Sequence, residues 1–219
     1  MPVYYNQEIV IAGEGVNLTG ELTIPEGATA ILIFSQAGGS SRHSRRSQIV
    51  AQHLQREGFG TLLPELLTQE ESQRYGAGYD IGLLTDRLVL VTESLKSLDL
   101  LGYYQLGYYG TSMGVAVALN AAARLPDVVR AVVSRGGRPD LADSLNRVEA
   151  PTLLIVGDQD PFVLQLNREA LEQFSCVRRL EVIQGASHTF DEPGKMEEID
   201  AITTAWFVQH LHPSLIVSQ

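Results

Sequence analysis

Ser112 is the residue around which a chemical function can be built. It stands at the centre of Gly-Thr-Ser-Met-Gly, residues 110–114, between an apolar segment and a run rich in alanine. The pattern Gly-x-Ser-x-Gly is typical of a tight turn from a strand into a helix, which holds the serine hydroxyl out at the end of a sheet. Gly110 and Gly114 fit this turn because a Cβ at either position would meet the neighbouring strand or helix. The alternative is a serine that only caps the helix.

A serine hydroxyl is a poor nucleophile at neutral pH, so it needs a base in hydrogen-bond reach and a group that orients the base. His188 follows the last predicted strand, and functional groups gather at the carboxyl ends of parallel strands. His43, beside a glycine-rich loop, is the rival base. The other histidines, His53, His210 and His212, lie within or at the end of predicted helices. His210 and His212 do not share a helical face, so they make a poor metal pair.

Two carboxylates, Asp158 and Asp160, follow the predicted strand 151–156. We assign Asp160 as the orienting acid because it clears the strand end by several residues. Asp160 before Pro161 is also typical of a helix N-cap and first helical residue, and Asp158 remains the alternative acid. The chain order Ser112, Asp160, His188 resembles that of the α/β-hydrolases.

A serine hydrolase must also bind the oxyanion of its tetrahedral intermediate. We expect one donor from the backbone N–H of Met113, at the start of the helix after the serine. The second donor is expected from the loop after the strand 28–34, where small residues let the backbone approach a substrate. Gly38 is the favoured donor there and Ala37 is the next choice.

The elements that position these residues alternate along the chain. A hairpin, 3–12 and 16–24, comes first, with a turn at 13–15. Further strands are predicted at 28–34, 60–63, 128–134, 151–156 and 179–183, and another begins at 106 and leads into the turn at Ser112. Helices are predicted at 44–57, 81–98, after Ser112, 141–148, 161–174 and 196–211. The pattern predicts one domain, 1–219, with a mostly parallel sheet of about eight strands and helices on both faces.

The apolar spacing of Leu84, Leu88, Val91, Leu95 and Leu98 defines the buried face of the helix 81–98. Residues 65–82 form the longest irregular stretch, either a partial cover over the site or a plain surface excursion.

Composition limits the function classes. The chain has 219 residues, 44% hydrophobic and 19% charged, which is ordinary for a globular protein. A net charge of −10 argues against nucleic-acid binding, and no apolar run approaches the length of a membrane span. One cysteine, Cys176, excludes an internal disulfide and favours a reducing cytoplasm. No signal peptide, metal-ligand cluster or phosphate-cradling glycine motif is recognised, so we expect a cytoplasmic protein without metal or cofactor.

These motifs together resemble the dienelactone-hydrolase-like branch of the α/β-hydrolases, over nearly the whole chain. The resemblance rests on residues 110–114, 157–160 and 185–188, with segments 40–44 and 134–140 similar to an uncharacterised subgroup. That subgroup often has His-Gly where this chain has Gln36 and Ala37. True dienelactone hydrolases carry cysteine at the elbow where this chain has Ser112, and Cys176 lacks elbow glycines, so dienelactone is not carried over as substrate. The resemblance implies an α/β-hydrolase fold, and no large cap domain is inserted.

Several arginines are placed to contact a substrate. Arg42 lies at the start of the first predicted helix, with Arg45 and Arg46, and a helix start favours an anion. Arg135 and Arg138 follow a strand end at the same sheet edge as Ser112. We hypothesise that Arg42, Arg135 or Arg138 holds a substrate carboxylate or phosphate; the alternative is that they pair with Asp140, Asp143 or Glu65, or face water.

The sequence therefore predicts a serine hydrolase that cleaves small carboxylic esters through an acyl-enzyme. The alternatives are a thioesterase, acyltransferase or peptidase on the same three residues, or a non-catalytic binding protein that shares the fold. The expected partner is a small-molecule ester rather than nucleic acid or membrane, and the oligomeric state is left open.

Overall fold

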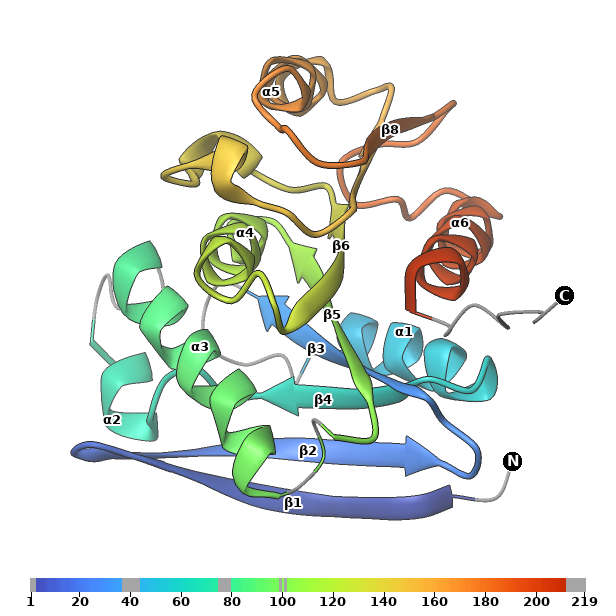
Figure 1. Cartoon of the computed structure of the whole chain (residues 1–219). Coiled ribbons are helices and arrows are strands. Elements are labelled where there is room, and N and C mark those ends of the chain that lie inside the picture. Colours follow the sequence, from blue (N-terminus) through green and yellow to red (C-terminus); the bar gives the residue numbers. More distant parts are fainter. Residues whose placement is uncertain (1–2, 37–43, 75–79, 99, 101, 212–219) are drawn as a thin grey trace, which may run out of the picture.

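Eight strands form a single sheet in the computed structural model, which describes residues 3–36, 44–74, 80–98, 100 and 102–211 (Figure 1). Their order across the sheet is β1-β2-β4-β3-β5-β6-β7-β8. The strands are β1 (Val3–Gly13), β2 (Val16–Pro25), β3 (Ala30–Gln36), β4 (Gly60–Pro64), β5 (Gln105–Thr111), β6 (Val129–Arg135), β7 (Thr152–Gly157) and β8 (Arg178–Ile183).

One strand of this order, β2, runs opposite to all the others. β1 pairs antiparallel with β2, and Gly13 stands opposite Val16, so only Glu14 and Gly15 form the turn. Gly15 has φ +71°, a conformation that glycine adopts without steric cost. β2 is antiparallel to β4, and every later neighbour pairs in parallel. The predicted mostly parallel sheet with an N-terminal hairpin is confirmed.

Helices cover both faces of the sheet, α3 and α4 on one side and α1 and α6 on the other (Figure 1). In β3, Ile31 and Ile33 pack on the α3–α4 side, and Leu32 and Phe34 on the α1–α6 side. Each is at most 2% exposed, which explains why the strand is a continuous apolar run. The helices are α1 (Arg45–Arg56), α2 (Gln69–Ser72), α3 (Ile81–Ser97), α4 (Gly114–Arg124), α5 (Pro161–Leu171) and α6 (Lys195–Leu211).

The buried face of α3 follows the predicted spacing with one correction. Leu84, Leu88, Val91 and Leu95 are at most 1% exposed. Leu98 was predicted to continue this face, but it is 47% exposed, because α3 ends at Ser97.

Two further sequence predictions are corrected. The single helix predicted over 141–148 is replaced by two 3₁₀ helices, Pro139–Leu141 and Leu145–Arg147. The physical reason lies between them, where the Asp143 N–H donates to Oδ1 of Asn120 on α4 at 2.9 Å instead of continuing a helix.

The stretch 65–82 was predicted to be irregular, but it contains α2. Thr68 and Glu71 cap its start reciprocally through side chain and backbone. Residues 75–79 lie outside the described residues, so the predicted cover over the site stays a prediction.

Within the described part of the chain, no helix combines the length and apolar character needed to cross a bilayer.

Candidate active site

A cavity of about 210 Å³ opens at the carboxyl ends of β3, β5 and β6, beside the start of α1 and the loop after β8. Its lining residues are mostly polar: Gln36, Ser44, Arg46, Ser47, Thr111, Ser112, Arg135, Gly136, His188 and Thr189. The structure thus brings Ser112 and His188, 76 positions apart in sequence, to one cavity.

Ser112 lies in the tight turn between β5 and α4, with φ +49°. A non-glycine residue in this region carries roughly 1–3 kcal/mol of strain, which the surrounding contacts must offset. Gly114 permits the turn, because a Cβ there would lie 2.3 Å from the carbonyl oxygen of Ser35. The Ser35 hydroxyl also donates to the Gly114 carbonyl at 2.8 Å. The end of β3 and the elbow are therefore locked together.

The loop after β6 supports the elbow from the other side. The Arg138 N–H donates to the carbonyl oxygen of Ser112 at 3.1 Å. A Cβ at Gly137 would lie 2.2 Å from Cγ2 of Val115, so this close approach depends on glycine. Ser112 is thus held between the β3 and β6 ends.

The His188 ring pairs with Asp160, not with Asp158. His188 Nδ1 lies 2.7 Å from Asp160 Oδ2, and the histidine side chain is 50% exposed against 16% for the aspartate. The other oxygen, Oδ1, accepts from the Val163 N–H at 3.2 Å and caps α5. The two interpretations of Asp160 from sequence, helix cap and histidine partner, therefore hold for one carboxylate at once. Oδ1 of Asp158 is buried and has no hydrogen-bond partner within the described residues.

Backbone contacts bring the Asp160 and His188 loops together. A Cβ at Gly157 would lie 2.2 Å from the Ala186 carbonyl oxygen, so only glycine allows the loops to touch. The Asp158 N–H donates to Ile183 O at 3.1 Å, and the Gln159 N–H donates to Ala186 O at 3.0 Å. These bonds set the two loops in register.

Residues that the sequence analysis did not single out anchor the His188 loop. Phe190 is 1% exposed and has φ +57°, so the loop is pinned by a buried ring in a strained backbone conformation. Oε1 of Glu192 accepts from the Ser187 N–H at 3.1 Å. Hydrogen bonding to Ser187 lowers the pKa of Glu192, so its carboxylate stays charged. The pattern of apolar residues in the sequence could not predict these two roles, because they depend on the conformation of the loop.

Among the described residues, no hydrogen bond joins the Ser112 hydroxyl to His188. Such bonds are often long in sites without substrate and tighten when substrate binds.

The predicted oxyanion donors are described only in part. Met113 follows Ser112 and caps the start of α4, where the first N–H groups have no intrahelical partner. Gly38 and Ala37 lie outside the described residues, as do Arg42 and the rival base His43. Gln36 is described, and its Oε1 accepts from the Ser47 hydroxyl at 2.8 Å, which ties the end of β3 to α1.

The arginines of this region differ in their partners. Arg138 forms a two-bond fork with Asp140, at 2.8 and 2.7 Å, and stacks over Phe162 at 5.7 Å. Arg46, which lines the cavity, pairs with Asp191 at 2.5 Å. Arg135 lies on the cavity wall, 8% exposed. Of the anion-binding candidates, Arg138 is engaged by its own loop and Arg135 faces the cavity.

Two other histidines, His53 and His210, and the cysteine do not line this cavity. His212 lies outside the described residues. His53 bonds Thr204 Oγ1 at 3.2 Å, and His210 stacks on Trp206 with 4.4 Å between ring centroids. Cys176 is partly buried, and burial raises the pKa of its thiol, as expected for a packed thiol.

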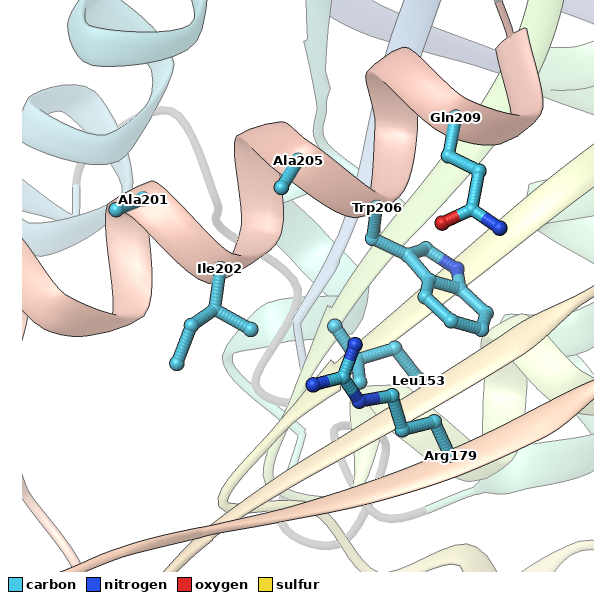
Figure 2. Close-up of a pocket in the computed structure, with 7 residues that line it drawn as sticks. All are labelled: Leu153, Arg179, Ala201, Ile202, Ala205, Trp206 and Gln209. Carbon is cyan, nitrogen blue, oxygen red and sulfur yellow. The ribbon is translucent and has the colours of Figure 1, made fainter.

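A second cavity, about 270 Å³, lies between α6 and the β7–β8 edge (Figure 2). Trp206 and Ile202 face it from α6, and Arg179 faces it from β8. The side chain of Arg179 pairs with Glu181. This cavity is larger than the first, but it contains neither a serine nor a histidine, so the candidate site is the smaller one.

A sequence model of the dienelactone hydrolase family matches residues 18–209. The crystal structure of a dienelactone hydrolase from Anabaena variabilis is 45% identical, with a TM-score of 0.91 over 95% of this chain and 99% of that one. An esterase structure from Pyrococcus furiosus is 17% identical, with a TM-score of 0.76 over 95% of this chain and 92% of that one, and shows the shared fold alone.

Curated proteins from two strains of Mycobacterium tuberculosis, named "Putative phosphoribosyl transferase", are 45% identical over 211 residues. The match covers 96% of this chain and 48% of each relative, so the chain spans about half their length. The family match, the close structural relative and the sheet order agree: the chain belongs to the dienelactone hydrolase family and has its α/β-hydrolase fold.

Proposed function

We propose that this protein is a serine hydrolase that cleaves small carboxylic esters through an acyl-enzyme on Ser112. The observation that carries the proposal is the 2.7 Å pair of His188 Nδ1 and Asp160 Oδ2 on a histidine that lines the same cavity as Ser112. A base oriented by a carboxylate beside a serine in a strained turn is the arrangement that activates a hydroxyl.

In this proposal Asp160 accepts the Nδ1–H of His188, which leaves Nε2 free to take a proton. The Oγ of Ser112 attacks the ester carbonyl carbon while its proton moves to Nε2, and the carbonyl electron pair moves to the oxygen. The tetrahedral intermediate then expels the alcohol, which takes the proton from Nε2. Water repeats both steps on the acyl-enzyme, releasing the acid and restoring Ser112.

The oxyanion is stabilised by the Met113 N–H, with Gly38 or Ala37 as the proposed second donor. Each donor is worth roughly 3 kcal/mol in the transition state, because it is already oriented toward the developing charge. The hydrogen bond between Ser35 and Gly114 fixes the end of β3 against the elbow, which supports a donor from the loop that follows β3.

The name of the curated relatives is not carried over as a second function. Those proteins are about twice as long, and nearly all of the stretch of this chain that matches them also matches the dienelactone hydrolase model. Thioesterase, peptidase and acyltransferase activities would use the same Ser112. They differ from ester hydrolysis in the bond that is cleaved or in the acceptor that takes the acyl group.

A fluorophosphonate probe followed by peptide mapping tests the nucleophile. We expect one adduct, on Ser112, in the folded protein and none in Ser112→Ala. The kcat of Ser112→Ala for simple esters is expected to fall on the order of 10³-fold or more, with the melting temperature retained. The matched control is Ser72→Ala, which removes an exposed hydroxyl on α2. Turnover like that of the wild type in Ser112→Ala would end the proposal, and transfer to an added alcohol faster than hydrolysis would reassign it as an acyltransferase.

A further inference from the structure

Arg135 is a buried cation on the wall of the candidate site. It is the last residue of β6 and 8% exposed, and it lines the cavity that contains Ser112 and His188. Its Nη1 donates to the thioether sulfur of Met196 at 3.6 Å, a weak acceptor. No carboxylate of the described chain forms an ion pair with it. A buried guanidinium without an anionic partner is costly, and five fixed donors beside an open cavity fit a bound anion.

The start of α1 faces the same cavity. Ser44, Arg46 and Ser47 all line it, and Ser44 is the N-cap of this 12-residue helix. The first turn of α1 contains no acidic residue, so the positive end of the helix dipole is not neutralised from within the helix. A helix start and a buried guanidinium on one cavity both favour an anion there.

The donors around this wall fit a phosphate group better than a carboxylate. Arg46 and Arg135 are the two guanidinium groups of the lining, and the helix start adds about half a charge. Asp191 offsets one of the guanidinium charges, because it pairs with Arg46. Asp200, outside the lining, attracts both His53 and Arg135. A phosphate monoester offers three oxygens and up to two charges to the two guanidinium groups and the helix start, whereas a carboxylate offers two oxygens and one charge.

We propose that the substrate of this site is an ester that also carries a phosphate monoester, with the phosphate on Arg135 and the start of α1. The position of the ester at Ser112 rests on the proposed function, whereas the phosphate site is inferred separately from Arg135 and the start of α1. Guanidinium groups bind phosphate oxygens in pairs, and the Ser44 hydroxyl and first N–H groups of α1 supply donors for the third oxygen.

The first experiment compares esters that differ only in one end group. Each series contains three esters of equal chain length, which end in a methyl, a carboxylate or a phosphate monoester. In one series the end group is on the acyl chain, and in the other it is on the alcohol. We expect kcat/KM of the phosphate compound to exceed that of the methyl compound at least about tenfold in one series, with the carboxylate between them. In Arg135→Gln this ratio is expected to approach one, whereas Arg124→Gln, a surface arginine paired with Asp86, should keep it.

An unchanged ratio in Arg135→Gln, or no phosphate preference in either series, overturns the proposal. A carboxylate preference as large as the phosphate preference overturns the choice of phosphate. If Arg135→Gln does not fold, Arg135→Lys is used; it keeps the charge but loses the planar fork, so the ratio should fall severalfold.

The second experiment needs no turnover. Inorganic phosphate, compared with chloride at equal ionic strength, is expected to raise the melting temperature of the wild type by a few degrees more than that of Arg135→Gln. An equal shift in both proteins contradicts the phosphate site. An Arg135-dependent shift in a protein that neither reacts with fluorophosphonate nor cleaves any ester would overturn the proposed function while supporting the phosphate site.

Discussion

Asp160 and Asp200 each interact with a residue that lines the candidate site, Asp160 with His188 and Asp200 with Arg135, and their surroundings differ. Both oxygens of Asp160 have partners, the His188 ring and the Val163 N–H. Asp200 is 9% exposed, and its Oδ1 is buried without a hydrogen-bond partner in the described chain. Near it, the Tyr109 hydroxyl is also buried and has no hydrogen-bond partner in the described chain. Among the described hydrogen bonds, the Arg135 side chain donates only to the sulfur of Met196.

The difference separates two uses of buried polar groups. On the Asp160 side, each bond fixes the direction of a side chain, as a proton transfer requires. On the Asp200 side, charges remain incompletely paired inside the protein, which lowers stability but leaves donors free for a ligand. In the proposed function, the first side supplies the reaction geometry, and in the proposed phosphate site the second side supplies the binding group.

Asp160→Asn is expected to have the largest effect, and it tests whether the Asp160 side serves the reaction. An amide cannot orient His188 as a carboxylate does, and it does not stabilise the imidazolium, so kcat should fall roughly 10²–10⁴-fold. Asparagine caps helices as well as aspartate, so the free energy of unfolding should change by less than about 1 kcal/mol. Steady-state kinetics and urea unfolding of the same samples measure the two quantities separately.

The matched control is Asp158→Asn, two residues away on the same loop. Asp158 makes no contact with His188 among the described hydrogen bonds, so kcat should stay within a few fold of wild type. A larger loss of kcat in Asp158→Asn than in Asp160→Asn would exchange the roles of the two acids.

Gly157→Ala tests whether backbone contact holds the Asp160 side together. The new Cβ would meet the Ala186 carbonyl oxygen at 2.2 Å, so the Asp160 and His188 loops must separate. We expect a loss of roughly 1–3 kcal/mol in the free energy of unfolding, as for other overpacked sites, together with a fall in kcat. Denaturant unfolding and ester turnover provide the measurements.

Gly82→Ala in α3 is the control, because a Cβ there meets Asp80 Oδ1 only at 3.4 Å. Alanine is favoured over glycine in a helix by up to about 1 kcal/mol, so this change should be neutral or stabilising. If Gly157→Ala were as stable and active as Gly82→Ala, the loops would not depend on close approach.

The pairing of His188 with Asp160 could be predicted from the sequence because its signals are local. The glycines around Ser112 and the Asp-Pro pair at 160 and 161 have conformational meaning that is independent of distant contacts. The continuous apolar strands predicted which strand ends meet, and hence that the loop of His188 lies near the loop of Asp160.

The other side could not be predicted in the same way. Arg138 pairs with Asp140, whereas Arg135 bonds only the sulfur of Met196 among the described hydrogen bonds. This difference depends on the direction of each side chain at the end of β6, and the sequence left both alternatives open. The pairing of Arg46 with Asp191 joins α1 to the loop after β8, a contact between positions 145 apart. The 3₁₀ helices after β6 were missed because the Asn120 side chain, more than 20 residues earlier, takes a backbone N–H that a helix would have used.

The smallest expected effect, and the one that tests the binding side directly, is that of Asp200→Asn on stability. Burial raises the pKa of Asp200 above its ordinary value, and attraction to His53 and Arg135 offsets only part of this. A carboxyl group whose pKa is higher in the folded state stabilises the fold while protonated. That contribution is lost as the pH rises from the unfolded-state pKa, about 3.9, through the folded-state pKa. Asp200→Asn should therefore be more stable than wild type at pH 7, by about 1 kcal/mol, and the difference should shrink toward pH 3.

Urea unfolding of wild type and Asp200→Asn from pH 3 to pH 8 measures this difference. Asp191→Asn gives the opposite sign, because a hydrogen bond from Thr189 lowers the pKa of Asp191, so its removal should cost stability at pH 7. If Asp200→Asn instead lost stability at pH 7 and matched wild type at pH 3, Asp200 would be a well-paired carboxylate like Asp160. Arg135 would then have an internal counter-ion, and the two sides of the site would no longer differ in the way that leaves its guanidinium free for a ligand.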